Sequence, residues 1–321
     1  MNRALPLYPR RDPHDRLRAE PPARFPGAML NVTNRCNLTC AHCFVYTDGN
    51  PNDPADDIPD DELLAELERV RERHGIYGML WMGGEPMIRW RLLERGVKLF
   101  QRNVITTNGT IPLRDFGSSV TYVVSLDGPE DLNDRVRGAG VYAKVKKTLG
   151  AVPDDFAPTV QIQCVVNKLN QHRLEELVLD FLDSQADGLA FTFHVPSEGE
   201  VSELAWRDVE ERESAVDAVL ALKQRYPSFV WNSRRALELM RPATARLVTE
   251  RCPALSTVLP LYVERGAFSN PKCCYGNNAD CDRCGGWVVF AHAAKLAGPW
   301  DEHVPRADGQ SLLEMYFSAG E

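Results

Sequence analysis

The chain has 321 residues, of which 44% are hydrophobic, enough for one large catalytic domain with a smaller appended unit. Asp and Glu total 45 against 37 Lys and Arg, and the net charge of -8 offers no broad basic surface for a nucleic-acid backbone. There is no run of about 18 apolar residues, and the N-terminal segment has charges and prolines where a signal peptide needs an apolar region. These features predict a cytoplasmic protein that binds neither nucleic acid nor membranes.

Short apolar segments bounded by turn residues predict six strands, which are Ala28–Val32, Gly78–Met82, Asn103–Thr106, Tyr122–Leu126, Val160–Val166 and Leu189–Val195. Segments with helical periodicity, such as Asp60–His74 and Leu174–Ser184, lie between them. Alternating strands and helices favour parallel strands joined by crossovers. The sequence therefore predicts an α/β fold, a partial (β/α)6 TIM-like barrel with its active site at the carboxyl ends of the strands.

Three regions are expected along the chain: an N-terminal arm at 1–27, the barrel at 28–200, and a helical, cysteine-rich extension at 201–321. The arm is rich in Pro, Arg and Asp and lacks a steady apolar period. In the extension, Ser202–Tyr226 and Arg234–Glu250 are predicted as two long helices, and Arg251–Gly286 as a cysteine-rich loop.

Three cysteines, Cys36, Cys40 and Cys43, follow the first predicted strand in the segment NRCNLTCAHCF. An electron-transfer cluster of four irons takes four cysteine ligands, so a set of three leaves one iron open for another group. A structural zinc site is the alternative, with His42 as its fourth ligand.

Five more cysteines form the spacing Cys-x20-Cys-Cys-x6-Cys-x2-Cys, and they are Cys252, Cys273, Cys274, Cys281 and Cys284. The two-residue gap between the last two lets both thiolates reach one metal centre. Zinc fits this group too, but a second iron–sulfur cluster is the preferred interpretation. The ninth cysteine, Cys164, lies inside a predicted strand and is interpreted as a buried small hydrophobic residue.

The segment CNLTCAHC resembles the Cys-x3-Cys-x2-Cys signature of the radical S-adenosylmethionine (SAM) superfamily, and WMGGEP resembles its glycine-rich motif. The resemblance implies that the three cysteines hold a [4Fe–4S] cluster whose open iron is chelated by SAM. One electron then releases a 5′-deoxyadenosyl radical, which implies an external reductase such as flavodoxin or ferredoxin. The motif residues that receive the methionine amino group are Gly83, Gly84, Glu85 and Pro86.

Further polar residues at predicted strand ends are candidates for contacts with SAM. Ser125, Asp127 and Asn108 supply the group types that bind a methionine carboxylate or a ribose, although turns use the same Asp-Gly and Asn-Gly pairs. The resemblance implies that Asn167 contacts the nucleoside. It also implies that His42 stacks by the adenine, at a position where the family usually has an aromatic residue.

The second cysteine group resembles the shortened auxiliary-cluster tails of the SPASM and twitch branch of the superfamily. This implies one auxiliary [4Fe–4S] cluster, expected on Cys273, Cys274, Cys281 and Cys284. Cys252 is then a free thiol that can donate a hydrogen atom to a substrate radical, and the outcome is epimerisation. The alternative is that Cys252 is a ligand and one of the adjacent pair is spare, in which case the cluster accepts an electron and the outcome is oxidation.

The size and cysteine layout are similar to those of epimerases and dehydrogenases that act on aminocyclitols and amino sugars in antibiotic biosynthesis. The short segment before the first strand favours a small-molecule substrate over a peptide. Acidic residues near strand ends are candidates to bind a polycationic substrate, namely Asp134, Glu198, Glu200 and Asp208. A peptide-modifying maturase and a non-enzymatic iron–sulfur carrier are the alternatives.

Overall fold

The structure is a computed structural model that describes residues 24–45, 58–264, 267–271, 273–276 and 278–304. Most of the expected N-terminal arm, residues 1–23, lies outside these ranges. No helix in the described part of the chain is long and apolar enough to cross a bilayer.

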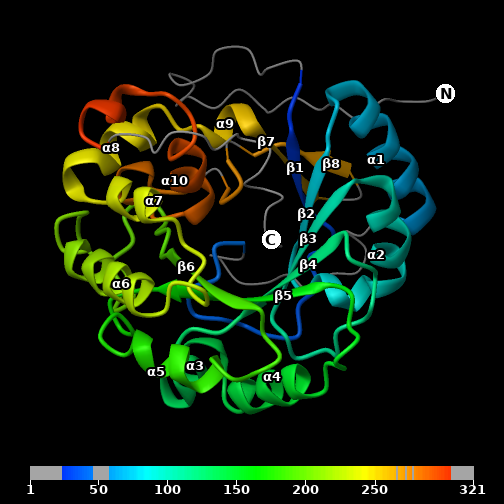
Figure 1. Cartoon of the computed structure of the whole chain (residues 1–321). Helices are drawn as coiled ribbons and strands as arrows, with labels where there is room; N and C mark the ends of the chain where they lie inside the picture. Colours follow the sequence, from blue (N-terminus) through cyan, green and yellow to red (C-terminus); the bar gives the residue numbers. More distant parts are fainter. Residues whose placement is uncertain (1–23, 46–57, 265–266, 272, 277, 305–321) are drawn as a thin grey trace.

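A single eight-stranded sheet with the strand order β6-β5-β4-β3-β2-β1-β7-β8 forms the centre of the molecule (Figure 1). All neighbouring strands pair in parallel except β7 and β8. The strands are β1 (Gly27–Asn31), β2 (Gly78–Met82), β3 (Arg102–Thr107), β4 (Val120–Ser125), β5 (Thr159–Val166), β6 (Gly188–Phe193), β7 (Val258–Glu264) and β8 (Ala267–Ser269). The six expected strands and the partial α/β barrel are therefore confirmed.

Helices surround the outer face of the sheet (Figure 1). The α-helices are α1 (Asp60–His74), α2 (Trp90–Gly96), α3 (Glu130–Arg137), α4 (Val141–Gly150), α5 (Leu174–Phe181), α6 (Glu213–Arg225), α7 (Arg234–Leu239), α8 (Pro242–Glu250), α9 (Ala254–Thr257) and α10 (Trp287–Ala293). The described residues also form the 3₁₀ turns η3 (Pro86–Arg89), η4 (Val97–Leu99), η5 (Cys281–Arg283) and η6 (Pro299–Glu302).

The extension after β6 differs from its prediction in three places. The first long helix starts only at Glu213, because the Ser202 hydroxyl accepts hydrogen bonds from the Leu204 and Ala205 amides and holds a turn there. The second is split into α7 and α8 at Pro242, which has no amide hydrogen and favours an extended conformation at the residue before it. The supposed loop contains β7, which adds to the free edge of β1.

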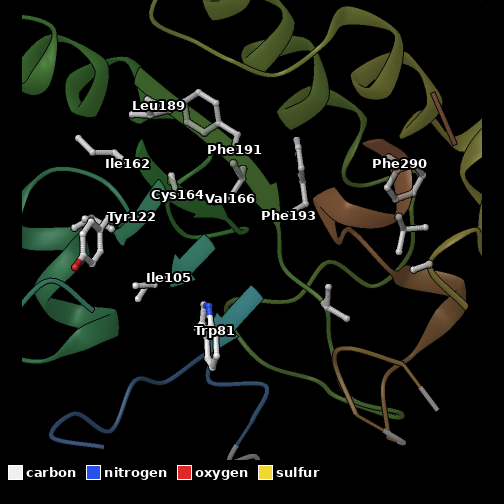
Figure 2. Close-up of a cluster of buried hydrophobic side chains, with 14 of the residues drawn as sticks. Trp81, Ile105, Tyr122, Ile162, Cys164, Val166, Leu189, Phe191, Phe193 and Phe290 are labelled. Carbon is white, nitrogen blue, oxygen red and sulfur yellow. The ribbon is translucent and has the colours of Figure 1, made fainter. Parts of the chain in front are cut away.

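One continuous apolar core joins the barrel to this extension. Alternate residues of the strands face the helices, and Figure 2 shows several of them, including Trp81, Ile162 and Phe191. Phe290 of α10 belongs to the same core. In Figure 1, α7, α8 and α10 lie between β6 and β7, so the extension occupies the opening between two edges of the barrel.

The outer edge of β6 is covered by the segment that follows α6. Leu189 exchanges backbone hydrogen bonds with Phe229 and Trp231. The fully buried Asn232 side chain then acts like a further strand residue: its Oδ1 accepts from the Phe191 amide at 2.7 Å, and its Nδ2 donates to the Phe191 carbonyl at 2.8 Å. The backbone N–H and C=O groups of Phe191, which would otherwise be unpaired in the core, thereby have hydrogen-bond partners.

Replacing this amide tests how much the edge contributes. Asn232→Leu leaves the buried Phe191 N–H and C=O without partners, and we expect it to lower the free energy of unfolding by roughly 2 to 4 kcal/mol. Denaturant unfolding of the metal-free protein measures the change. Gln101→Leu, at an exposed side chain, is the control and should stay within about 0.5 kcal/mol of wild type. Equal stabilities of the two variants would contradict the assignment.

Candidate functional site

The candidate SAM-binding residues lie where the parallel strands end. The cysteine loop follows β1, the GGEP segment follows β2, and Asn108, Asp127 and Asn167 follow β3, β4 and β5. Because neighbouring strands run in parallel, all of these segments meet at one end of the barrel.

The chain segment that carries Cys36 lies directly on the GGEP segment. The Gly84 amide donates to the Thr33 carbonyl and the Glu85 amide to the Arg35 carbonyl, both at 2.8 Å. A Cβ atom on Gly84 would lie 2.1 Å from the Arg35 carbonyl oxygen, so only glycine fits there. Gly84 therefore lets the GGEP backbone pack closely against the chain at Arg35 and Cys36. It would also allow a ligand to approach the backbone closely.

Glu85 ties the end of β2 to the end of β3. Its fully buried carboxylate accepts from the Thr107 hydroxyl at 2.8 Å, the Asn108 amide at 2.7 Å and the Met87 amide at 2.9 Å. Burial raises the pKa of Glu85 to about 7, against the opposing effect of these donors. Pro86 then starts η3, where its missing amide costs nothing. The Glu85 side chain therefore supports the loops, and its expected contact with the methionine amino group stays a prediction.

The other side of the cysteine loop is fixed by His42. Its Nε2 lies 2.6 Å from Oδ2 of Asp127, which also forms an ion pair with Arg137 at 2.7 Å. The remaining oxygen of Asp127 accepts from the Val165 amide at 2.9 Å. The nearby Arg137 and His42 hold the pKa of this fully buried carboxylate far below its usual range, although burial alone would raise it.

These contacts give Asp127 and His42 a structural role, and their expected contacts with SAM stay predictions. Both oxygens of the Asp127 carboxylate contact the protein, so this residue orients the cysteine loop. The Asp127 carboxylate binds the edge of the His42 ring. It thereby holds in place the residue that lies between Cys40 and Cys43 in the sequence. Arg137, at the end of α3, had no signal in the sequence beyond its charge.

Two asparagines at strand ends are also engaged internally. Asn108 donates to Oδ1 of Asn37 in the cysteine loop at 2.8 Å and accepts from the Thr110 hydroxyl at 2.7 Å. The fully buried Asn167 accepts from the Leu169 amide at 2.9 Å, which is a local turn contact. Of the expected polar contacts, the half-buried Ser125 is the one whose side chain has no hydrogen bond within the described residues.

The three thiols of the first group are mutual neighbours. The negative charges that Cys40 and Cys43 can carry act on the Cys36 thiol, whose Sγ also accepts from the Leu38 amide at 3.5 Å. Burial, followed by these charges and that of Glu85, raises the pKa of Cys36 to about 11. Metal ligation removes such protons outright. The donor set and its N–H···S contact fit an iron–sulfur cluster.

The five cysteines of the extension also gather in space. Cys252 lies within electrostatic reach of each of the other four. Three Sγ atoms share one local geometry, in which they accept from the amide two residues further on: Cys252 from Ala254, Cys273 from Tyr275 at 3.4 Å, and Cys284 from Gly286 at 3.5 Å. Cys36 has the same contact in the first group. Cys252 thus shares its local geometry with Cys273 and Cys284 and lies among the other thiols of the group.

Cys274 differs from the other thiols in its packing, although it lies within electrostatic reach of Cys252, Cys273 and Cys284. It packs on Met29, Met82 and Val258, on the face of the sheet opposite to the helices. Next to it, the ring of Tyr275 contacts Phe44, which follows Cys43, at 4.9 Å between centroids. The two cysteine groups therefore approach each other across the inner face of the barrel. A single zinc ion needs its ligand atoms within about 2.3 Å of one point, and the described residues form no such cluster.

The extension is held on the strand end of β6. The Phe193 amide donates to the Gly285 carbonyl at 3.0 Å, and a Cβ atom on Gly285 would lie 2.5 Å from Cβ of Phe193. Arg212, just before α6, is 1% exposed and donates to the Cys284 carbonyl at 2.8 Å. Burial lowers the pKa of Arg212 to about 10, so it stays charged at neutral pH. Sequence analysis missed this residue.

Three of the four acidic residues expected to bind a polycationic substrate are used inside the protein. Glu200 pairs with the buried His194 at 3.1 Å, and hydrogen bonds from His194 and Ser202 outweigh desolvation and lower its pKa to about 2. Asp134 accepts from the Tyr142 amide at 2.8 Å, and Asp208 from the Glu211 amide at 2.9 Å. Glu198 is exposed.

Comparisons with known proteins agree with this geometry. Residues 30–181 match the model of the Radical SAM superfamily. The chain is 28% identical over 207 residues to Fe-coproporphyrin III synthase of Methanosarcina barkeri, covering 61% of this chain and 51% of that protein. It is 30% identical over 158 residues to mycofactocin maturase MftC of Mycobacterium ulcerans, covering 45% and 41%. It thus spans about half the length of these relatives or less.

Two solved structures share the fold at low sequence identity. Native anSMEcpe with bound AdoMet has a TM-score of 0.59 at 17% identity, covering 82% of this chain and 78% of that one. SuiB of Streptococcus suis also has a TM-score of 0.59, at 15% identity, covering 75% and 59%. The family match shows that residues 30–181 form a radical SAM domain, of a superfamily whose members bind a [4Fe–4S] cluster and SAM, and the two solved structures share its fold.

Proposed function

We propose that Cys36, Cys40 and Cys43 hold the SAM-cleaving cluster and that the loop carrying them is positioned by Gly84. The observation that supports this most directly is the seating of the cysteine loop on the GGEP segment by two backbone hydrogen bonds. Gly83, Gly84 and Ser125 are the proposed contacts for SAM, with the buried, unpartnered Oδ1 of Asn31 a further acceptor beside Gly83.

We further propose that the extension holds a second [4Fe–4S] cluster on Cys252, Cys273, Cys281 and Cys284. The N–H···S contacts of three of these thiols, and the electrostatic reach of Cys252 to each of the other three, support this set. When bound, the first cluster with SAM supplies a 5′-deoxyadenosyl radical that removes a substrate hydrogen atom, and the second cluster supplies a one-electron acceptor. The chain's own residues hold the thiols, exclude water and orient the substrate.

This assignment favours oxidation of the substrate over epimerisation. A hydroxyl-bearing carbon that has lost its hydrogen atom becomes a ketone carbon by losing one electron to the second cluster and the hydroxyl proton, and no thiol is required for that. Epimerisation needs a hydrogen donor, and in this arrangement the donor is Cys274 and not Cys252. The substrate proposed is an amino sugar or aminocyclitol, and the reductant is a flavodoxin or ferredoxin.

A peptide is the second candidate substrate. Glu200, Asp134 and Asp208 each already accept hydrogen bonds within the protein, which leaves fewer of their oxygens for a polycationic sugar. MftC is named a maturase, and the structural neighbours include SuiB bound to precursor peptide SuiA. Anaerobic reconstitution followed by a screen for substrate-dependent 5′-deoxyadenosine, with amino sugars and peptides in parallel, separates the two.

The first cysteine group should carry all SAM cleavage. We expect replacement of Cys36, Cys40 and Cys43 by Ala to abolish 5′-deoxyadenosine formation with dithionite and to lower bound iron from about eight to about four per chain. Cys164→Ala, at the buried cysteine outside both groups, is the control and should keep about eight irons and full cleavage. Reductive SAM cleavage by the triple variant would disprove the assignment.

The two candidate spare thiols should behave differently. Because Cys252 is proposed as a ligand, Cys252→Ala should lose about four irons, whereas Cys274→Ala should keep about eight. Iron analysis and the spectrum of the second cluster measure this. The opposite pattern would return Cys252 to the role of free thiol.

The fate of solvent deuterium tests the outcome of the reaction. Oxidation predicts that wild-type turnover in D₂O places no deuterium on the carbon that loses hydrogen. One deuterium per product, lost in Cys274→Ala without loss of iron, would instead establish epimerisation with Cys274 as the donor.

A further inference from the structure

Arg212 is a fully buried cation without a carboxylate partner. Its side chain is enclosed by the start of α6, the end of α7 and the Cys284 segment. It donates to the carbonyls of Cys284 at 2.8 Å, Arg283 at 3.3 Å and Met240 at 3.2 Å. Its buried Nε has no hydrogen-bond partner, and no carboxylate among the described residues lies within ion-pair distance of it.

Other well-buried arginines in this chain do have such partners. Arg89 pairs with Asp60 at 2.5 Å, Arg137 with Asp127 at 2.7 Å, and Arg235 with Asp301 at 2.6 Å. The desolvation of an arginine costs several kcal/mol, and a neighbouring negative charge normally offsets it. No carboxylate among the described residues supplies such a negative charge to Arg212.

The remaining neighbours offset only part of this cost. The rings of Phe193 and Phe290, both labelled in Figure 2, have their centroids at 5.9 and 6.0 Å from the guanidinium carbon, near the outer limit for a cation–π contact. Carbonyl oxygens contribute dipoles but no net charge. A buried anion is therefore the missing component, and the one group of acids close by is the cysteine group, since Cys284 and Arg212 interact electrostatically.

We propose that Arg212 is the fixed counter-cation of the second cluster, a positioning residue that stabilises the cluster's added negative charge on reduction. Four thiolates on an oxidised [4Fe–4S] core give a net charge of about −2, and reduction adds one more negative charge. A buried cation beside Cys284 favours the reduced form and raises the reduction potential. Arg212 thereby makes the cluster a better acceptor for an electron from substrate. This inference rests on the second cluster of the proposed function.

The test uses the full chain with Cys36, Cys40 and Cys43 replaced by Ala, so that only the second cluster contributes. Into it are introduced Arg212→Gln, which removes the charge, Arg212→Lys, which keeps it, and Arg235→Gln, a matched control. Arg235 also binds backbone carbonyls of the extension but has its own carboxylate partner. The readouts are iron content, the midpoint potential from a redox titration followed by electron paramagnetic resonance, and denaturant unfolding with and without the cluster.

We expect Arg212→Gln to decrease the equilibrium constant for reduction at least tenfold, which is about 59 mV for one electron. Arg212→Lys and Arg235→Gln should leave it within about threefold of the parent. Arg212→Gln should also destabilise the cluster-loaded protein more than the metal-free protein, because only the loaded form contains the anion that the guanidinium meets.

A solely structural role for Arg212 gives a different result. The potential would then be unchanged in Arg212→Gln, both forms would lose stability equally, and the proposal would be overturned. If Arg212→Gln assembles no cluster, Arg212→Lys decides: assembly with a parent-like potential supports the role of charge, and failure to assemble contradicts it. Absence of iron from the triple-Ala parent would refute the second cluster itself, which is distinguishable from failure of the Arg212 inference.

Discussion

The backbone contact between the cysteine loop and the end of β2 is the constraint on which the site depends. Gly84 and Glu85 donate to carbonyls just before Cys36, and the carboxylate of Glu85 then binds the end of β3. The loop, β2 and β3 are thereby joined in a single hydrogen-bonded unit. On the far side of the loop, His42 reaches Asp127, which binds β5 through the Val165 amide. The backbone that carries the thiols is thus held from two sides, which is the arrangement that a precise cofactor site requires.

Charge is distributed differently at the two cysteine groups. Beside the first group, the buried Arg137 is neutralised by Asp127, so the protein itself balances the charge there. Beside the second group, the buried Arg212 has no such partner among the described residues. Reduction potentials of iron–sulfur clusters depend on nearby charge, hydrogen bonds and burial. This difference accords with the proposed division of roles, in which the first group serves SAM cleavage and the second accepts an electron.

The extension is part of the same folded unit as the barrel. It contributes β7 to the sheet, apolar side chains to the common core, and backbone hydrogen bonds to the end of β6. Figure 1 shows its helices between the two edges of the barrel. The contact of Tyr275 with Phe44 then brings the second cysteine group to the inner face, close to the loop of the first. A substrate between them can meet both groups without movement of a separate domain.

The sequence alone determined the parts of this protein that depend on local pattern. Alternating apolar and helical periods located six strands, and α1 over Asp60–His74 has the predicted bounds, because burial on one face imposes those periods. The family was identified from two short motifs, the spacing of Cys36, Cys40 and Cys43 and the GGEP segment. Each motif binds the cofactors of the family through a few residues that are adjacent in the sequence. Side-chain partners were decided only by the tertiary structure. Asp127 and Asn167 have the residue types of a binding site, yet contacts with His42, Arg137 and local amides occupy them. The pairing of β7 with β1, the position of Cys252 among the other thiols and the unpaired charge of Arg212 all join segments far apart in the chain. Local sequence patterns do not encode such long-range contacts, because these contacts arise from the packing of the whole sheet and its helices.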